Sequence, residues 1–332
     1  MALCLTKTNT FAQVAGYSFT QSSGSYIPIV GGTVPAIASN PGAWDDGVSN
    51  VVGNIGFTFI YNGIGYSQCS ISSNGAIAFG TTAITSTNYA SISSTAGYAG
   101  SVAAWSRDLQ GQATAPLGEI RYLSSGGVFT IQWSNTRRYN STTANAERFE
   151  MQIKLYQTTN VIQVIYGTWS DAISAATTNV GQVGLRGATN ADFNNRSVLT
   201  GGSWSASVAG AVNTATCFYN QSNIATKPAF GQTYTWSPPT CFLPTALTVS
   251  AITTSSATLS WTAPSLGTPV NYNWEVRTSG AAGSGAAGLT ASGTTAHPTV
   301  TAPVAGLSPA TTYSAYVRTH CGGTDFSSWS VA

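Results

Sequence analysis

Charged residues are scarce in this sequence. Only 7% of the 332 residues are Asp, Glu, Lys or Arg, whereas charged residues make up about 25% of an ordinary globular protein. The formal net charge is +2, and the largest cluster of basic residues is the pair Arg137-Arg138. Nucleic-acid binding needs a concentrated basic surface that displaces phosphate counterions. A nucleic-acid partner is therefore not expected.

The groups that carry most enzyme chemistry are also few. The two histidines, His297 and His320, both follow Cys241, so no Ser-His-Asp or Cys-His set can be built from the residues before it. No HExxH or GxSxG motif occurs. Glycosidases need two carboxylates about 5–10 Å apart, but Glu147 and Glu150 are three positions apart on a predicted strand and so face opposite sides. We expect a non-catalytic protein.

Long apolar runs and helical patterns are missing too. No run of 18 apolar residues is present, so the sequence predicts no membrane-spanning helix. No segment combines an apolar i, i+3, i+4, i+7 stripe with capping residues at its ends. Helical folds are therefore not expected.

The main pattern in the sequence is the alternation of apolar and polar residues that is typical of β-strands. In "RFEMQIKLY", Phe149, Met151, Ile153 and Leu155 alternate with polar residues, as in a half-buried antiparallel strand. Turn-forming segments such as "QTTN" and "SSGG" separate similar runs. The sequence predicts an all-β protein made of a large antiparallel β-sandwich followed by a smaller, immunoglobulin-like one.

Proline marks the boundary between these two units. Pro238 and Pro239 in "TWSPPTCFLPT" remove backbone donors and stiffen the chain. We therefore predict a first domain over 13–236, a linker over 237–243 and a second domain over 244–332. Residues 1–12 end in the small-residue pattern of a secretory signal and are interpreted as the remnant of one. A native start without structure and a lipid anchor at Cys4 are the alternatives.

Cysteine usage fits export. If Cys4 belongs to the signal, four cysteines are left: Cys69, Cys217, Cys241 and Cys321. An even number is typical of an oxidising compartment, and no CxxC spacing suggests zinc. On this count, Cys69 and Cys217 are predicted to form a disulfide.

Two sets of residues are candidates for binding. Trp44, Trp169 and Trp204 have polar neighbours in the sequence, and exposed aromatic rings can stack on sugars; the alternative is that they are core residues. Asp45 and Asp46, followed by Gly47, offer oxygen ligands to Ca²⁺, although a solvated turn would look the same. We therefore predict a ligand site at the three tryptophans and a Ca²⁺ site at the two aspartates.

The C-terminal region resembles a fibronectin type III domain from Pro244 to Ala332. The resemblance rests on Trp261, on "YNWEVR" and on "LSPATTY" leading into "SAYVRT". It implies a tyrosine corner at Tyr313 and places Cys241 and Cys321 at one pole of the sandwich, where they can form a disulfide. "SSWS" resembles the start of a last strand, so the chain is expected to be a fragment of a longer protein.

The first domain resembles the nidogen-type extracellular domain and its bacterial surface relatives. Three blocks carry the resemblance: "IGFTFIYNGIGYSQCSISSNGAIAFG", "SVAAWSRDL", and "GEIRYLSSGGVFTIQWSN" with "ERFEMQIKLYQTTNVIQVIYG" and "VGLRG". A concanavalin-type lectin sandwich is the competing assignment. Asn74-Gly75 within the first block predicts a type I′ hairpin, because that turn needs positive φ at both central residues.

These resemblances imply a function outside the cell. We expect a secreted or cell-surface protein fragment that acts in adhesion or recognition, with the fibronectin-like unit as a spacer. Its partner would be an extracellular glycan or protein, and no cofactor other than Ca²⁺ is expected. The alternatives are a carbohydrate-binding accessory region of a larger secreted hydrolase and a purely structural stalk.

Overall fold

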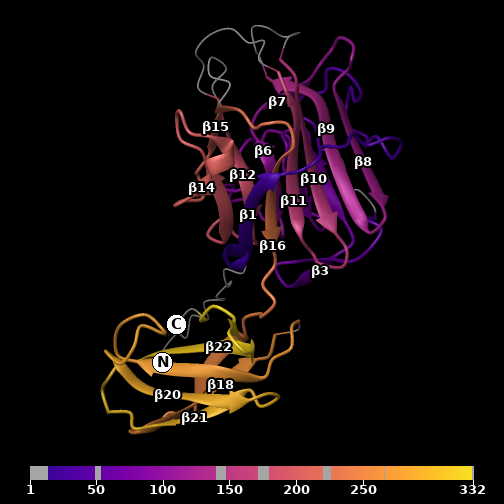
Figure 1. The fold of residues 1–332 in the computed structure, drawn as a ribbon. Coiled ribbons are helices and arrows are strands. Elements are labelled where there is room, and N and C mark those ends of the chain that lie inside the picture. The colour runs from indigo at the N-terminus through magenta and orange to yellow at the C-terminus, as the bar shows by residue number, and fades with distance from the viewer. Residues whose placement is uncertain are drawn as a thin grey trace. The chain divides into compact units, whose positions relative to one another are not determined.

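The computed structural model describes residues 14–48, 54–139, 147–170, 179–219, 226–264 and 266–330. The chain divides into a large unit, Tyr17–Pro238, and a smaller one that begins at Pro239 and also includes the short 3-10 turn Val14–Gly16. The strands of each unit are drawn in Figure 1. Among the described residues, no helix has the length and apolar character needed to cross a bilayer.

Two seven-stranded sheets make up the large unit. The first has the order β1-β16-β11-β10-β9-β7, with β8 also paired to β9, and the second has the order β14-β13-β12-β6-β5-β4, with β15 also paired to β12. In the first sheet the strands are β1 (Ser18–Ser23), β7 (Leu109–Gly111), β8 (Glu119–Ser125), β9 (Val128–Arg138), β10 (Phe149–Tyr156), β11 (Ile162–Trp169) and β16 (Gln232–Ser237). In the second they are β4 (Cys69–Ser72), β5 (Ala76–Phe79), β6 (Ser101–Ser106), β12 (Asn179–Arg186), β13 (Phe193–Ser197), β14 (Val208–Ala209) and β15 (Cys217–Tyr219).

Smaller elements complete this unit. Strands β2 (Phe59–Tyr61) and β3 (Ile64–Tyr66) form a separate hairpin, and Trp204–Ala206 is a 3-10 turn. The named strand pairs of the large unit are antiparallel. The predicted all-β architecture is therefore confirmed for the described residues.

Strand β10 shows how the alternating sequence builds the core. Phe149, Met151, Ile153 and Leu155 are fully buried, as their alternation predicts. Hydrogen bonds join the two sheets across this core: the Tyr166 hydroxyl on β11 donates to the carbonyl of Ala104 on β6 at 2.6 Å. The sheets therefore pack face to face as a sandwich.

The outer face of β10 is less exposed than its polar residues suggest. Gln152 is fully buried because the segment around Ile27 and Ile29 crosses over it. Its Nε2 donates to the Ile27 carbonyl at 2.7 Å and to Gln132 Oε1 at 2.8 Å, while the Ile29 amide donates to the same Gln132 oxygen at 2.9 Å. The two glutamines thus satisfy the backbone of this covering segment.

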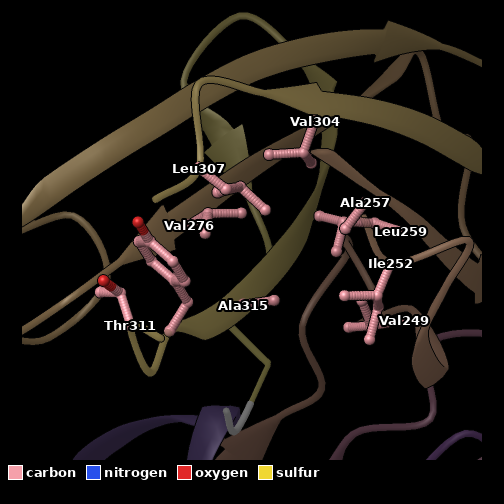
Figure 2. Close-up of a pocket in the computed structure, with 10 residues that line it drawn as sticks. Val249, Ile252, Ala257, Leu259, Val276, Val304, Leu307, Thr311 and Ala315 are labelled. Atoms are coloured by element: carbon pink, nitrogen blue, oxygen red, sulfur yellow. The ribbon is translucent and has the colours of Figure 1, made fainter. Parts of the chain in front are cut away.

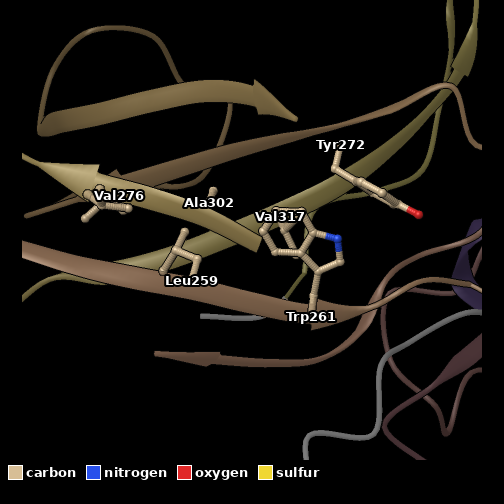
Figure 3. Close-up of a cluster of buried hydrophobic side chains, with 7 residues drawn as sticks. Leu259, Trp261, Tyr272, Val276, Ala302 and Val317 are labelled. Carbon is tan, nitrogen blue, oxygen red and sulfur yellow. The ribbon is translucent and has the colours of Figure 1, made fainter. Parts of the chain in front are cut away.

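The smaller unit is also a sandwich. A three-stranded sheet contains β17 (Thr245–Ser250), β18 (Ser256–Thr262) and β21 (Thr301–Ala305), and a four-stranded sheet contains β20 (Leu289–Ala296), β19 (Asn271–Arg277), β22 (Ser314–Gly322) and β23 (Asp325–Phe326). Figure 3 shows the core between them, which includes Leu259, Trp261, Tyr272, Val276, Ala302, Val304 and Val317.

Two predicted details of the smaller unit are present. Cys241 and Cys321 form a disulfide with their Cα atoms 5.7 Å apart. The Tyr313 hydroxyl accepts a hydrogen bond from the Ser308 amide at 2.8 Å, which is the tyrosine corner. Both tie a loop to the edge of the sandwich.

Candidate functional site

The predicted tryptophan platforms are wrong, because all three rings lie in the core. Trp44 and Trp204 have no exposed surface, and Trp169 is 4% exposed. The Trp169 ring stacks on Phe149 with centroids 4.4 Å apart. The Trp204 ring lies parallel to Tyr234, and its Nε1 donates to the Phe218 carbonyl at 3.0 Å. Stacking on a sugar needs an exposed ring face, which none of these residues offers.

Trp44 owes its burial to a glycine on the neighbouring strand. The Gly111 amide donates to the Trp44 carbonyl at 2.8 Å. A Cβ atom at Gly111 would come within 2.5 Å of the Trp44 ring nitrogen. Only a residue without a side chain allows the indole to lie this close to β7.

The predicted disulfide between Cys69 and Cys217 is also wrong, since both are buried free thiols. Cys69 lies on β4 and Cys217 on β15, and β5, β6 and β12 separate the two strands. At about 4.8 Å per strand the separation is roughly 19 Å, whereas bridged Cα atoms lie within about 7 Å. Burial raises the pKa of the Cys69 thiol to about 12, so this group stays protonated at neutral pH.

The Asn74-Gly75 turn differs from the predicted type I′ hairpin. Strands β4 and β5 are joined by three residues, Ser73 to Gly75, and within this turn positive φ occurs at Gly75 (74°) but not at Asn74. Asn74 is fully buried and acts through its side chain instead. Its Oδ1 accepts from the Leu109 amide at 2.9 Å, and its Nδ2 donates to the Ser86 carbonyl at 2.7 Å and to Asp46 Oδ1 at 3.2 Å. The turn therefore positions an aspartate.

Asp46 belongs to a cluster of three carboxylates. Asp45, Asp46 and Asp108 each place an oxygen within 4.8 Å of the others. Asp46 is exposed, and the other two are partly buried. The second oxygen of Asp46 accepts from the Tyr89 hydroxyl at 2.9 Å. The structure thus brings the two predicted aspartates together with a third, Asp108, from the turn between β6 and β7.

Close packing of like charges changes how this cluster binds protons. Burial, and then the charges of Asp46 and Asp45, raise the pKa of Asp108 to about 6, against the opposing effect of Arg107. Burial and the charge of Asp46 also raise the pKa of Asp45. A group of carboxylates in this state takes up either a proton or a cation readily.

The carboxylate cluster has the donor chemistry that Ca²⁺ prefers, because Ca²⁺ binds oxygen ligands, usually about six to eight of them. Both oxygens of Asp46 already accept hydrogen bonds from the protein. Asp45 and Asp108 are therefore the residues expected to hold an ion, with water or carbonyl groups as further ligands. Ca²⁺ binding at this cluster stays a prediction.

Sequence reasoning missed Asp108 as a member of this cluster. The residue stands in "SVAAWSRDL", one of the blocks that carried the nidogen-type resemblance. Nothing local links it to Asp45, which lies far away in the chain. The pairing of β4 with β5 and of β5 with β6 places the turn after β6, which holds Asp108, beside the turn between β4 and β5. The bridge between Val48 and Ser72, and the hydrogen bond from the Ser73 amide to the Gly47 carbonyl, bring the segment of Asp45 to the same place.

Two further carboxylates form ion pairs within the large unit. Glu147 is fully buried and pairs with Arg138 Nε at 2.6 Å. Glu119 pairs with Arg121 at 2.6 Å on the surface of β8. Neither arrangement resembles two carboxylates that face each other across a cleft.

Comparison with known proteins agrees with this architecture. A family model for NIDO-related domains matches residues 16–238, and one for the fibronectin type III domain matches residues 242–332. The first match covers more than half of the chain and agrees with the nidogen-type assignment rather than the lectin-type alternative. No curated protein matches.

Two of the solved structures that are similar to the chain contain fibronectin type III domains. A two fibronectin type III domain segment from chicken tenascin is 12% identical, covers 64% of this chain and 95% of its own, and has a TM-score of 0.25. The FN1–FN3 domains of chicken CNTN1 are 13% identical, cover 62% of this chain and 60% of their own, and have a TM-score of 0.23. The family models thus decide the assignment: this chain belongs to the NIDO-related family and carries a fibronectin type III domain after its NIDO-related domain.

Proposed function

We propose that this chain is a non-catalytic, extracellular or cell-surface protein that acts in adhesion or recognition. The observation that carries the proposal is the pairing of a NIDO-related domain with a fibronectin type III domain. Both domain types are typically non-catalytic. The Cys241–Cys321 disulfide supports a place outside the reducing cytosol. In this proposal the large unit recognises the partner, and the fibronectin unit acts as a spacer.

The large unit has the properties of a rigid scaffold. Its core contains aromatic rings from both sheets: Phe149 and Trp169 stack on each other, and Trp105 meets both of them edge to face. Loops at the ends of such a sandwich are the usual carriers of binding. The carboxylate cluster of Asp45, Asp46 and Asp108 lies at one such end.

A protein ligand is favoured over a glycan. The tryptophans that would have supported sugar stacking are buried, so the proposal of a carbohydrate-binding accessory region loses the observation that favoured it. The low content of charged residues, 7%, also argues against partners held mainly by charge, such as sulfated polysaccharides. An uncharged polar protein surface fits this chain better.

Binding of the purified full chain to immobilised extracellular proteins and to a polysaccharide panel tests the proposal. Saturable binding to a protein, retained at about 0.5 M salt where surface charges are screened, supports it. Saturable binding to a polysaccharide supports the hydrolase-accessory alternative. No binding to either set, by a chain that melts cooperatively, supports the stalk and overturns a recognition role.

A further inference from the structure

Strand β20 forms one edge of the four-stranded sheet in the smaller unit and is labelled in Figure 1. Among the described residues, β19 is the strand that pairs with it, so one side of β20 has no neighbouring strand. The strand is eight residues long. Unpaired backbone groups along an edge of this length can accept a strand from another chain.

The backbone groups of β20 point alternately to its two sides. The His297 amide, just after the strand, donates to the Val270 carbonyl at 3.1 Å. Hydrogen-bonded and non-hydrogen-bonded pairs alternate along an antiparallel ladder, so the next pair, and every second pair after it, is non-hydrogen-bonded. Ser292, Thr294 and Ala296 belong to these pairs. Their N–H and C=O groups therefore point away from β19, toward the open side of the sheet.

Strand β20 lacks, over most of its length, the features that usually protect a free edge. Charged residues, proline and bulges are the common devices, and β20 contains neither a charged residue nor a proline. Its register shift lies at Thr290, and pairing with β19 is regular from Ala291 to Ala296. The other sheet of this unit differs, since its edge strand β21 contains Pro303 and its edge strand β17 has a bulge within it.

Edges of the large unit are closed in other ways. Backbone bridges cover β4 at Ser72 and β8 at Tyr122. Strand β14 has only two residues. On β1, the Gln21 side chain accepts a hydrogen bond at 2.7 Å from Ser207, which precedes β14 of the other sheet. This contrast makes β20 the described edge that is best suited to strand addition.

The outer face of β20 also leaves room for a neighbouring strand. Val276 points into the interior between the two sheets (Figure 2), so the opposite face of β19 is the outer one. Asn273 lies on that outer face, and its Nδ2 donates to Thr294 Oγ1 at 2.9 Å. Ser292, Thr294 and Ala296 are accordingly exposed, and their side chains are small and uncharged.

A second copy of the same strand is the partner that these residues match. Around a two-fold axis, residue i faces residue j and residue j faces residue i. With the axis at Thr294, this residue faces its own copy, and Ser292 faces Ala296 of the second copy. A charge at the axis would meet itself, whereas two threonines form a favourable cross-strand pair. The Ala296 carbonyl accepts from the Thr299 amide at 3.0 Å, and its second lone pair is left for the pairing.

We propose that β20 pairs antiparallel with β20 of a second copy of this chain, so that two four-stranded sheets become one continuous sheet. The net charge of +2 gives little repulsion between the copies. The contact is small, so the association is weak and reversible. It brings two large units into one assembly and so raises the avidity for any partner that they recognise. The pairing itself does not depend on what that partner is.

Sedimentation velocity of the purified full chain tests the proposal. Between about 10 µM and about 0.3 mM, a range suited to weak interfaces, the sedimentation coefficient should rise toward that of a dimer. Thr294→Lys places a positive charge on each side of the axis and should weaken the association at least tenfold. Thr294→Glu should do the same with negative charges. An equimolar mixture of the two variants should restore the association, because opposite charges then face each other.

A charge elsewhere on the same unit is the matched control. Thr248 is an exposed threonine on β17, in the other sheet, and Thr248→Lys should associate as the natural chain does. The proposal is overturned if the natural chain stays monomeric up to about 0.3 mM, or if Thr294→Lys associates as strongly as the natural chain. If both Thr294 variants are monomeric and their mixture is too, the two strands do not face each other at this residue, which also overturns it.

Discussion

Arg277 and Glu275 stand two residues apart on β19, and their side chains together anchor the loop that follows this strand. Their side chains pair at 2.6 Å, with the Arg277 side chain fully buried. The Arg277 guanidinium also donates to the carbonyls of Gly285 and Ala287, both at 2.7 Å, while Glu275 accepts from the Gly283 amide at 3.0 Å. The Gly/Ala/Ser-rich loop after β19, which its composition predicts to be flexible, is therefore anchored at several points.

Replacing this arginine should release the loop. Arg277→Met leaves Glu275 without its counter-charge and four loop acceptors without a donor, and should destabilise the smaller unit by about 3 kcal/mol. Hydrogen exchange at the Gly283 amide, which should accelerate by at least tenfold, measures the effect. Arg121→Met is the matched control, because Arg121 also pairs with a glutamate two residues away but is partly exposed, and surface pairs contribute at most about 1 kcal/mol. Equal effects of the two substitutions would contradict this account.

The cysteines should divide into two classes. With the chain denatured but not reduced, iodoacetamide is expected to label Cys69 and Cys217 and to leave Cys241 and Cys321 unmodified. In the native state the first two should resist labelling, because both are buried. Peptide mass spectrometry reads out each position. Protection of Cys69 and Cys217 in the denatured, non-reduced chain would show that they are bridged after all.

The disulfide should matter for the stability of the smaller unit. Cys241→Ser combined with Cys321→Ser opens a covalent loop with a sequence separation of 80 residues and should cost about 4 kcal/mol on the chain-entropy model. Hydrogen exchange of the core amides of Val276 and Val317 reports the loss. Cys69→Ala is the control and should leave exchange in this unit unchanged. A double variant as stable as the natural chain would show that the bridge does not limit unfolding.

Strand periodicity and turn residues predicted the β-strands. Which segments pack on the outer faces of those strands depends on long-range contacts, which a local pattern does not show. The apolar side of β10 was predicted correctly because alternation is a local property of the sequence. The burial of Gln152 on its other side depends on Ile27, more than a hundred positions earlier. Likewise, Trp169 and Trp204 have polar neighbours along the chain but aromatic neighbours in space. The sequence predicted exposed rings because only the polar neighbours along the chain can be read from it.

The carboxylate cluster shows the same limit. Asp45 and Asp46 are adjacent in the chain and stood out as a pair. Their third partner, Asp108, could be assigned to them only once the order of the strands was known. The local pattern Asn74-Gly75 predicted a turn, as observed, but not its length or the hydrogen bond to Asp46.

The stability of the large unit should fall as pH rises toward neutrality because of Asp108. Its folded-state pKa of about 6 lies above the ordinary value of 3.8, so between these values the folded state binds more protons than the unfolded state. The free energy of unfolding from this group therefore decreases as pH rises through that window. In Asp108→Asn this slope should become shallower, with the raised pKa of Asp45 as the remaining contribution, and at pH 7.5 the variant should melt at a higher temperature than the natural chain.

Asp46→Asn tests the cause of this shift. Because burial outweighs the neighbouring charges, the loss of one charge should lower the pKa of Asp108 only in part. Melting temperatures between pH 4 and 8, measured by calorimetry, follow both variants. Identical pH profiles for Asp108→Asn and the natural chain would show that Asp108 titrates normally in the folded protein.

Ca²⁺ should compete with protons at the same cluster. Calorimetric titration at pH 7.5 is expected to show a single weak site, with a Kd of about 1 mM or below, as in extracellular Ca²⁺ modules. Binding should weaken at pH 5.5, because the ion must then displace the proton held by Asp108. Asp45→Asn and Asp108→Asn should each weaken it at least tenfold, whereas Asp325→Asn, in the smaller unit, should not. If about 10 mM Ca²⁺ gives no saturable heat at pH 7.5, the raised pKa of Asp108 reflects burial and crowding of like charges, and proton uptake is what this cluster does.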